Sequence, residues 1–274
     1  MGSIGAFFSI VFINPITNLL ILFYKLLFMV GFPYALGFAI ILLTILIRLI
    51  LYPFISAQIK SAKKMQTIAP HMANIRVQHK EDKKKQQEEL MKLYKEHNIN
   101  PASGCLPLLI QIPVIWSLYN VLTVIVSANT THAINEINNK LYPFLLPFLK
   151  IQSGWDTTFL GFALSATPSK LLSSAPYLLL VPVITGVLQF FLSLMMLPEN
   201  APVKDPKKED DFSAAFQKQS LFIFPVMIGF FSFTMPLGLS LYWNTFTVFG
   251  ILQQYLLVGS GGAKPWFKKV GINK

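Results

Sequence analysis

The chain has 274 residues, of which 53% are hydrophobic and 13% are charged, and its mean hydropathy is +0.54. A soluble globular domain usually has about 25% charged residues, and the apolar residues here come in runs of membrane-spanning length, so the composition excludes an ordinary soluble domain. We therefore predict an all-α integral membrane protein, because an open chain satisfies its backbone in lipid only as helices or as a closed barrel, and the alternating strands of a barrel are absent.

The first predicted element is an amphipathic helix over 14–30, which starts at the signal Asn14–Pro15. At about seventeen residues it is short for a span, so we expect it to lie at the membrane interface; a short first span is the alternative. The first transmembrane span follows over 32–56, and Pro53 is expected to kink or close it. Met1–Gly5 lacks the basic region and the cleavage site of a signal peptide, so we do not expect one in this chain.

The long polar stretch 57–100 is predicted to form a helical hairpin outside the membrane. Its first helix covers about 57–79, with an apolar stripe that Pro70 interrupts, and its second covers about 84–97. The stripe consists of Met65, Ile68, Met72 and Ile75. The alternative, a solvated charged linker, fits less well because the helical periodicity continues through both halves.

Four further spans are predicted after the hairpin. Between the second and the third lies 129–175, a segment poor in Lys and Arg, and its Trp155 and phenylalanines indicate contact with the membrane interface. A charged loop over 199–216 follows the third span, and a basic tail over 259–274 follows the fifth. The four spans cover 103–128, 176–198, 217–235 and 237–258.

The net charge of +11 fits either nucleic-acid contact or the basic cytoplasmic loops of a membrane protein. Its distribution favours the loops, since ten of the 23 Lys and Arg residues lie in 57–100, four in 204–218 and four in 264–274. With five spans these segments share one side of the membrane, which is then cytoplasmic by the positive-inside rule. The N-terminus and 129–175 are expected outside, and the C-terminus in the cytoplasm.

Arg48 lies deep inside the first span, about eight residues or ~12 Å from its cytoplasmic end. A charge at the centre of a span costs roughly 2.5–3.5 kcal/mol on insertion scales, so an arginine at this depth indicates a functional site. Thr44 and Tyr52 lie four positions before and after it and form one polar stripe with it.

Polar residues occur within three other predicted spans, at a depth similar to that of Arg48 in the second and third and somewhat nearer the outside in the fifth. They are Gln111 in the second span, Gln189 in the third, and Tyr242, Trp243 and Asn244 in the fifth. Because polar groups in a membrane normally face a protein interior or a water-filled cavity, we expect one hydrated concavity with Arg48 inside it. The predicted spans contain no Asp or Glu, so the charge of Arg48 is hydrated or held by neutral acceptors such as Gln111 and Gln189. The alternatives are that the glutamines only bridge helices and that Tyr242 and Trp243 are packing residues.

The sequence does not indicate catalysis, a metal or a cofactor. The four histidines lack the spacing of a metal site, and there is no phosphate-binding glycine loop, HExxH or serine-centred motif. The single Cys105 excludes an intramolecular disulfide and is expected to be a packing residue. Two other functions stay open: a small-solute transporter or channel with Arg48 as an anion site, and an intramembrane enzyme. The missing internal repeat argues against the first, and the missing acid, base or nucleophile pair argues against the second.

Three features together resemble the YidC/Oxa/Alb membrane protein insertases. They are the run YKEHNINPASGCLPLLIQIPVIWSLYNVL over 94–122, the arginine in the preceding span, and MPLGLSLYWNTFTVFGILQQYLL over 235–257. The likeness extends over nearly the whole chain in order, as an interfacial helix, five spans and a hairpin after the first span. It implies one insertase domain over 1–274, of the shorter Gram-positive type, because the large extracytoplasmic domain of Gram-negative members is absent. Gram-positive members are often lipoproteins, and no lipobox cysteine is visible here.

The resemblance implies a membrane protein insertase and chaperone of the bacterial plasma membrane, which is not an enzyme and uses no cofactor. Such a protein receives hydrophobic segments from the cytoplasm in a hydrated, positively charged groove and releases them sideways into lipid. Arg48 matches the groove arginine, and the hairpin over 57–100 matches the region implicated in substrate reception. The other expected groove residues are Thr44, Gln111, Gln189, Tyr242, Trp243 and Asn244. The implied partners are nascent membrane proteins and the lipid bilayer, together with the ribosome and the Sec translocon, and a monomer suffices for the groove.

Overall fold

The computed structural model describes residues 3–99, 106–126, 131–152, 154–198 and 212–269. Within these residues the chain is mostly helical, as predicted, with one short antiparallel strand pair, β1 (Thr158–Phe159) and β2 (Phe162–Ala163). Cys105, most of the predicted loop 199–216 and the ends of the predicted second span lie outside the described residues.

Three helical stretches in the described part of the chain are long and apolar enough to cross a membrane: Gly5–Met29, Ala35–Gln78 and Pro176–Met195. Two shorter apolar helices cover Gln111–Val126 and Leu221–Thr234. These findings support a multi-pass membrane protein, because so much apolar helix surface has no counterpart in an ordinary soluble domain.

The N-terminal helix is longer than predicted. It begins with α1 (Ser3–Phe8), continues through a π-helical turn η1 (Ser9–Ile13), and ends with α2 (Asn14–Met29). α2 itself begins at Asn14, as predicted, but the helical stretch before it was not predicted. In the π-turn the Asn14 N–H donates to Ser9 O, and this wider turn accommodates Pro15, which has no N–H to donate. The helical stretch Gly5–Met29 has 25 residues. Its length therefore fits either a helix at the membrane interface or a transmembrane span.

The first predicted span and the first hairpin helix form one continuous helix, α3 (Ala35–Gln78). Pro53 and Pro70 lie inside it, so Pro53 does not close the first span, and the helix continues past Pro70 within the apolar stripe. Both prolines are exposed, so their rings face away from neighbouring helices. A proline removes one backbone hydrogen bond, whereas ending a helix in lipid would leave several backbone groups unsatisfied.

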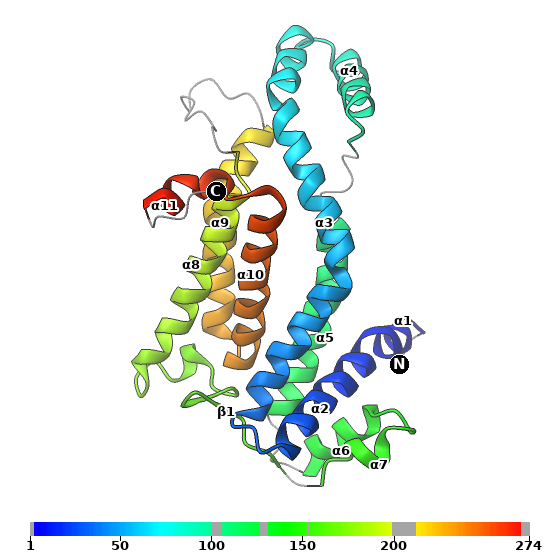
Figure 1. Ribbon diagram of the computed structural model, residues 1–274, viewed down its shortest axis with the longest axis vertical. Coiled ribbons are helices and arrows are strands. Elements are labelled where there is room, and N and C mark those ends of the chain that lie inside the picture. Colours follow the sequence, from blue (N-terminus) through cyan, green and yellow to red (C-terminus); the bar gives the residue numbers. More distant parts are fainter. Residues whose placement is uncertain (1–2, 100–105, 127–130, 153, 199–211, 270–274) are drawn as a thin grey trace.

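The helix α4 (Lys83–Glu96) packs antiparallel beside the far end of α3, as Figure 1 shows. Asp82 begins α4, because its side chain accepts a 3.0 Å hydrogen bond from the backbone N–H of Lys85. A separate small core holds the two helices together. Its buried members are Ile68, Met72, Leu93 and Ile99, packed against Met65, Ile75, Leu90 and Tyr94. All four residues of the predicted stripe contribute to this core.

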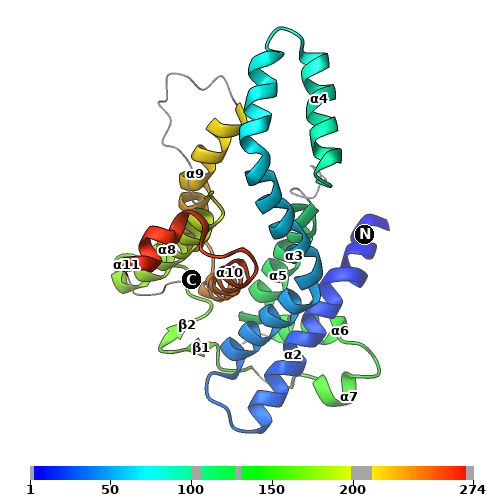
Figure 2. The same cartoon turned by 45° about the horizontal axis from the view of Figure 1, so that its top comes forward.

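The remaining long helices are α5 (Leu106–Val126), α8 (Leu180–Met195), α9 (Phe212–Thr234) and α10 (Leu237–Val258). α8 packs along α9, and α10 lies between α8 and α3, as both Figure 1 and Figure 2 show. α9 starts at Phe212 rather than at the predicted 217, whereas α10 has the predicted bounds. α10 therefore contacts α3, α5, α8 and α9, which places its side chains at the centre of the bundle.

At the opposite end from the hairpin, residues 131–152 and 154–179 form short elements below the ends of the long helices, and we refer to them as the cap (Figure 1). The cap contains α6 (Thr131–Lys140), α7 (Leu146–Leu149), the strand pair, and the 3-10 turns η3 (Pro168–Lys170) and η4 (Pro176–Leu179). Trp155, one of the aromatic residues behind the prediction that 129–175 contacts the membrane interface, is buried, and its Nε1 donates a 2.9 Å hydrogen bond to Ile125 O. The indole therefore joins the cap to α5.

The predicted basic tail begins with two short helical elements, η6 (Gly261–Ala263) and α11 (Lys264–Lys269). The Gly262 N–H donates a 2.9 Å hydrogen bond to Leu197 O just after α8. The start of the tail is thus attached to the bundle.

Candidate functional site

Arg48 lies between α3 and α10 and is buried, with an exposed fraction of 4%. Its Nη2 donates a hydrogen bond to the backbone carbonyl of Phe246, and its guanidinium carbon lies 3.4 Å from the centre of the Phe246 ring. The Phe249 ring is farther away, at 5.9 Å. A desolvated cation over an aromatic face gains about 2 kcal/mol or more. The charge is therefore held by a carbonyl dipole and a ring, not by either predicted glutamine.

Gly250 leaves the space that the guanidinium occupies. A Cβ atom at this position would lie 2.7 Å from Arg48 Nη2 and 3.3 Å from Leu192 Cδ2. The first distance is too short for a non-bonded contact, so any other residue at position 250 would displace the arginine. The glycine therefore shapes the site, even though it has no polar side chain.

The hydrogen bonding of Arg48 is incomplete. A guanidinium has five N–H donors, yet its buried Nε has no hydrogen-bond partner in the part of the chain that the structure describes. No described acidic side chain forms an ion pair with Arg48. Because burying a charge without a counter-charge is unfavourable, the site is suited to accept an anionic group.

The residues on either side of Arg48 in the predicted polar stripe differ in how deeply they are buried. Thr44 is fully buried, and its hydroxyl donates a 2.7 Å hydrogen bond to Ile40 O of its own helix. Tyr52 is 39% exposed. Thr44 thus contributes a satisfied hydroxyl next to the site, and Tyr52 faces outward.

Gln111 and Tyr242 connect α5 to α10. Gln111 Nε2 donates a 2.8 Å hydrogen bond to the hydroxyl of Tyr242, whose side chain has no exposed surface. The Tyr242 and Phe246 rings are 5.9 Å apart. A continuous series of contacts therefore runs from Gln111 through Tyr242 and Phe246 to Arg48.

Gln189 connects α8 to α10 on another side of the same helix. Its Oε1 accepts hydrogen bonds from Trp243 Nε1 at 3.4 Å and from Thr247 Oγ1 at 3.5 Å. Both distances are long for hydrogen bonds, so the amide is loosely held. Asn244 is half-buried, and its Oδ1 has no partner among the described residues. Successive residues of a helix point about 100° apart, so Tyr242, Trp243 and Asn244 do not face one common surface.

Sequence reasoning missed several site residues on α10. They are Phe246, Phe249, Gly250 and Gln253, whose buried amide donates a 3.2 Å hydrogen bond to Ser56 Oγ of α3. Their spacing from Tyr242 places them on one face of the helix. That spacing was the available signal, but it does not tell which helix the face contacts.

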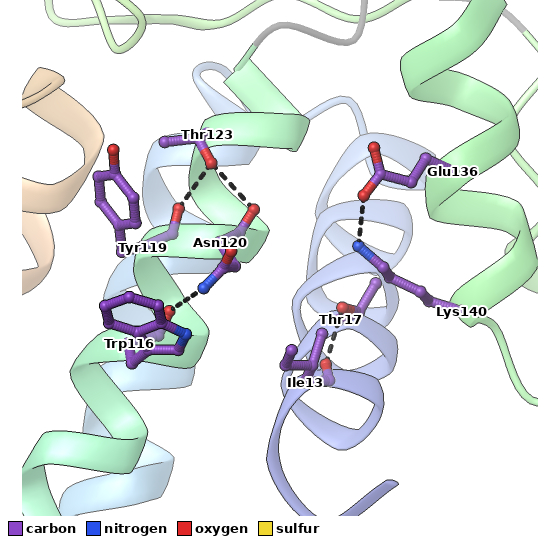
Figure 3. A network of polar contacts seen from close by, with 8 residues as sticks. All are labelled: Ile13, Thr17, Trp116, Tyr119, Asn120, Thr123, Glu136 and Lys140. Atoms are coloured by element: carbon purple, nitrogen blue, oxygen red, sulfur yellow. Dashed lines mark hydrogen bonds and ion pairs between the residues drawn. The ribbon is translucent and has the colours of Figure 1, made fainter. Parts of the chain in front are cut away.

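The exposed face of α5 differs from the face that carries Gln111. Figure 3 shows Asn120 donating to Trp116 O at 2.7 Å and Thr123 donating to Tyr119 O at 2.8 Å, so both side chains bond to their own helix. The Trp116 side chain is 62% exposed. Polar groups satisfied within one helix are compatible with lipid, so this face is suited to an apolar environment. Gln111, in contrast, bonds to Tyr242 of the neighbouring helix α10.

Comparisons with known proteins agree on one family. The family model described as "60Kd inner membrane protein" matches residues 28–261. The chain is 32% identical over 274 residues to "Membrane protein insertase YidC" of Streptomyces avermitilis, covering 94% of this chain and 60% of that protein. It is 34% identical over 247 residues to "Inner membrane protein ALBINO3, chloroplastic" of Arabidopsis thaliana, covering 85% of this chain and 48% of that protein.

A solved structure gives the same indication. A crystal structure described as an active YidC insertase with the first transmembrane domain resolved matches with a TM-score of 0.52 and 30% sequence identity. The match covers 89% of this chain and 45% of that one. The chain thus spans 60% or less of the length of these relatives.

Proposed function

Because the chain belongs to the family of the 60Kd inner membrane protein, which includes the YidC insertases, we propose that it inserts proteins into a bacterial plasma membrane and assists their folding there. It binds a hydrophobic segment on the cytoplasmic side together with the polar segment that must cross, and it releases the hydrophobic segment into lipid. No covalent bond forms or breaks.

The observation that carries this proposal is the buried guanidinium of Arg48 without an acidic partner among the described residues. A substrate segment with Asp or Glu supplies the missing counter-charge for the time of its passage. Charge-assisted hydrogen bonds between guanidinium and carboxylate are roughly twice as strong as neutral ones. The carboxylate therefore competes well with the Phe246 carbonyl.

In the proposed topology, the first half of α3 and the helices α5, α8, α9 and α10 cross the membrane. The hairpin and the tail from 259 lie in the cytoplasm, and the cap lies outside. The distribution of lysine and arginine supports this arrangement, since the hairpin contains ten of the 23 basic residues of the chain. The N-terminal helix precedes these five spans.

The proposed groove is lined from α3, α5, α8 and α10 and admits water and the substrate together. Its polar residues are Arg48, Thr44, Gln111, Gln189, Tyr242, Trp243 and Asn244. A hydrated groove shortens the distance that a polar segment crosses in hydrocarbon. The apolar segment then gains about 25 cal/mol for each Å² removed from water, which drives its release.

The proposed partners are nascent membrane proteins and the surrounding lipid, with the ribosome and the Sec translocon as suppliers of substrate. The basic tail and the hairpin provide a positive surface toward the ribosome or acidic lipid. One copy of the chain contains all of the groove residues.

Site-specific crosslinking tests this function. Photoreactive residues at positions 48, 111 and 189 are expected to crosslink a single-span substrate that is stalled during insertion. Leu26 of α2, which is 47% exposed, is the control position and is expected to give little crosslinking. Equal yields at all four positions would contradict a substrate path through the groove. Solute flux through vesicles with only this chain would favour the transporter alternative instead.

A further inference from the structure

One turn of α10 surrounds the guanidinium of Arg48. Phe246 contributes its ring and its backbone carbonyl, Phe249 lies at the edge, and Gly250 leaves the space. We refer to Phe246, Phe249 and Gly250 as the arginine cradle. The cradle contacts the charge without any acidic group, and Arg48 is 4% exposed in the folded protein.

The cradle holds Arg48 in an incompletely bonded state. The ring covers one face of the guanidinium, and one carbonyl accepts from Nη2, while Nε is buried and unpartnered among the described residues. A carboxylate that bonds Nε and one Nη together would satisfy this edge, as in a bidentate pair. An uncharged peptide segment has no carboxylate with which to form such a bidentate pair.

From this geometry we infer that Phe246 is a positioning residue that covers Arg48 until a carboxylate-bearing segment displaces it. Phe246 thereby determines which segments recruit the arginine, because carboxylates displace the ring and neutral segments do not. The inference rests on the proposed function for its substrate. The covering of Arg48 in the resting protein is a separate property, which can be measured without a substrate.

The chain allows a direct measurement, because Arg48 and Arg76 are its two arginines. The arginine-selective reagent phenylglyoxal is added to the full chain in lipid vesicles, and modification at each arginine is followed by mass spectrometry. Arg76 lies in the hairpin and is partly exposed, so it serves as the internal reference. In the wild-type protein, Arg48 is expected to react much more slowly than Arg76.

Phe246→Leu removes the aromatic face but keeps an apolar side chain and the backbone carbonyl. The modification rate of Arg48 relative to Arg76 is expected to rise about tenfold, as the loss of a desolvated cation–π contact predicts. Phe246→Tyr keeps the ring and is expected to restore the slow rate. Val248→Ala is the control on the same helix, since its side chain lies outside the cradle and is 43% exposed, and the rate is expected to change little.

Gly250→Ala provides a second variant that leaves both rings in place. Its methyl group would lie 2.7 Å from Arg48 Nη2, so the guanidinium must move out of the cradle and the modification rate of Arg48 is expected to rise. An unchanged rate in both Phe246→Leu and Gly250→Ala overturns the inference, even if insertion proceeds as proposed. If Arg48→Ala leaves insertion unchanged while the rates rise as expected, the proposed function fails and the covering of Arg48 stands.

Discussion

The hydroxyl of Tyr242 in α10 accepts a 2.8 Å hydrogen bond from the side-chain amide of Gln111 in α5. The tyrosine has no exposed surface, so in the resting protein its hydroxyl depends on this partner. Tyr242→Phe and Gln111→Leu are each expected to destabilise the protein by about 1–3 kcal/mol, because each leaves a polar group unsatisfied. The measurement is a double-mutant cycle on the free energy of unfolding in mixed micelles.

The cycle distinguishes a specific bond from general packing. The double variant is expected to cost clearly less than the sum of the two single variants, because it leaves neither partner unsatisfied. Strictly additive costs would show that the two side chains do not interact in solution.

The cap packs on α3 through a close approach at Gly37. A Cβ atom there would lie 2.0 Å from Phe159 Cδ2 of β1, so Gly37→Ala forces the ring out of place. Overpacking of this kind costs about 1–3 kcal/mol, which we expect as a lower unfolding temperature. Phe159→Leu in the Gly37→Ala background is expected to recover most of the loss. A Gly37→Ala variant as stable as the wild type would show that the ring does not rest on α3.

Asn18 joins α2 to the cap. Its Nδ2 donates to Lys140 O at 2.9 Å, and its Oδ1 accepts from the Tyr142 N–H at 2.9 Å. Asn18→Ala removes both bonds, and an unsatisfied buried donor costs about 1–3 kcal/mol. Hydrogen exchange at the Tyr142 amide is therefore expected to accelerate.

Asn138 provides the matched control for Asn18, because it makes the same kind of bonds within the cap. Its side chain bonds both the N–H and the carbonyl of Ile151, each at 2.9 Å. Asn138→Ala should accelerate exchange at Ile151 and leave Tyr142 protected. If both variants accelerate exchange across the whole cap, the two asparagines do not act locally.

Much of the helix pattern could be predicted from the sequence where local signals mark the ends. α10 has its predicted bounds because Pro236 precedes it and Gly259, with φ of 84°, ends it. The prediction that Pro53 closes the first span was wrong, because the free-energy cost of ending a helix depends on its surroundings and not only on the proline. The start of the N-terminal helix was missed because a π-turn has no clear sequence signal.

The polar side chains of the candidate site could be predicted from the sequence, but the groups that hold Arg48 could not. Arg48 is conspicuous in an apolar span, and Gln111 and Gln189 are conspicuous at a similar depth. The actual acceptor of the arginine is the backbone carbonyl of Phe246, and every residue has such a carbonyl. Gly250 matters through the absence of a side chain. Neither contribution is visible until α3 and α10 are placed side by side.

The base of the hairpin is tied to the end of α8. Gln66 Nε2 donates a 2.7 Å hydrogen bond to Met196 O, one of the carbonyls that a helix end leaves unpaired. Gln66→Ala is expected to broaden the range of hairpin positions. The measurement is the distance distribution between spin labels at the exposed positions Ala73 and Val187, in a Cys105→Ala background.

Thr67→Ala is the matched control for Gln66→Ala. Its hydroxyl bonds only to Lys64 O of the same helix among the hydrogen bonds of the described residues, so the distance distribution should stay as in the wild type. A Gln66→Ala distribution identical to that of Thr67→Ala would mean that the side chain does not restrain the hairpin.

We propose that Arg48 supplies the charge that lets an acidic segment cross. The most direct measurement is insertion into vesicles of two single-span substrates that differ only in their N-terminal segment, one acidic and one neutral. We predict that Arg48→Ala slows insertion of the acidic substrate about tenfold, which corresponds to 1.4 kcal/mol, and leaves the neutral substrate nearly unaffected. Arg48→Lys, which keeps the charge, should retain most of the activity. Equal insertion of the acidic substrate by the wild type and Arg48→Ala, or an equal loss for both substrates, would contradict the claim.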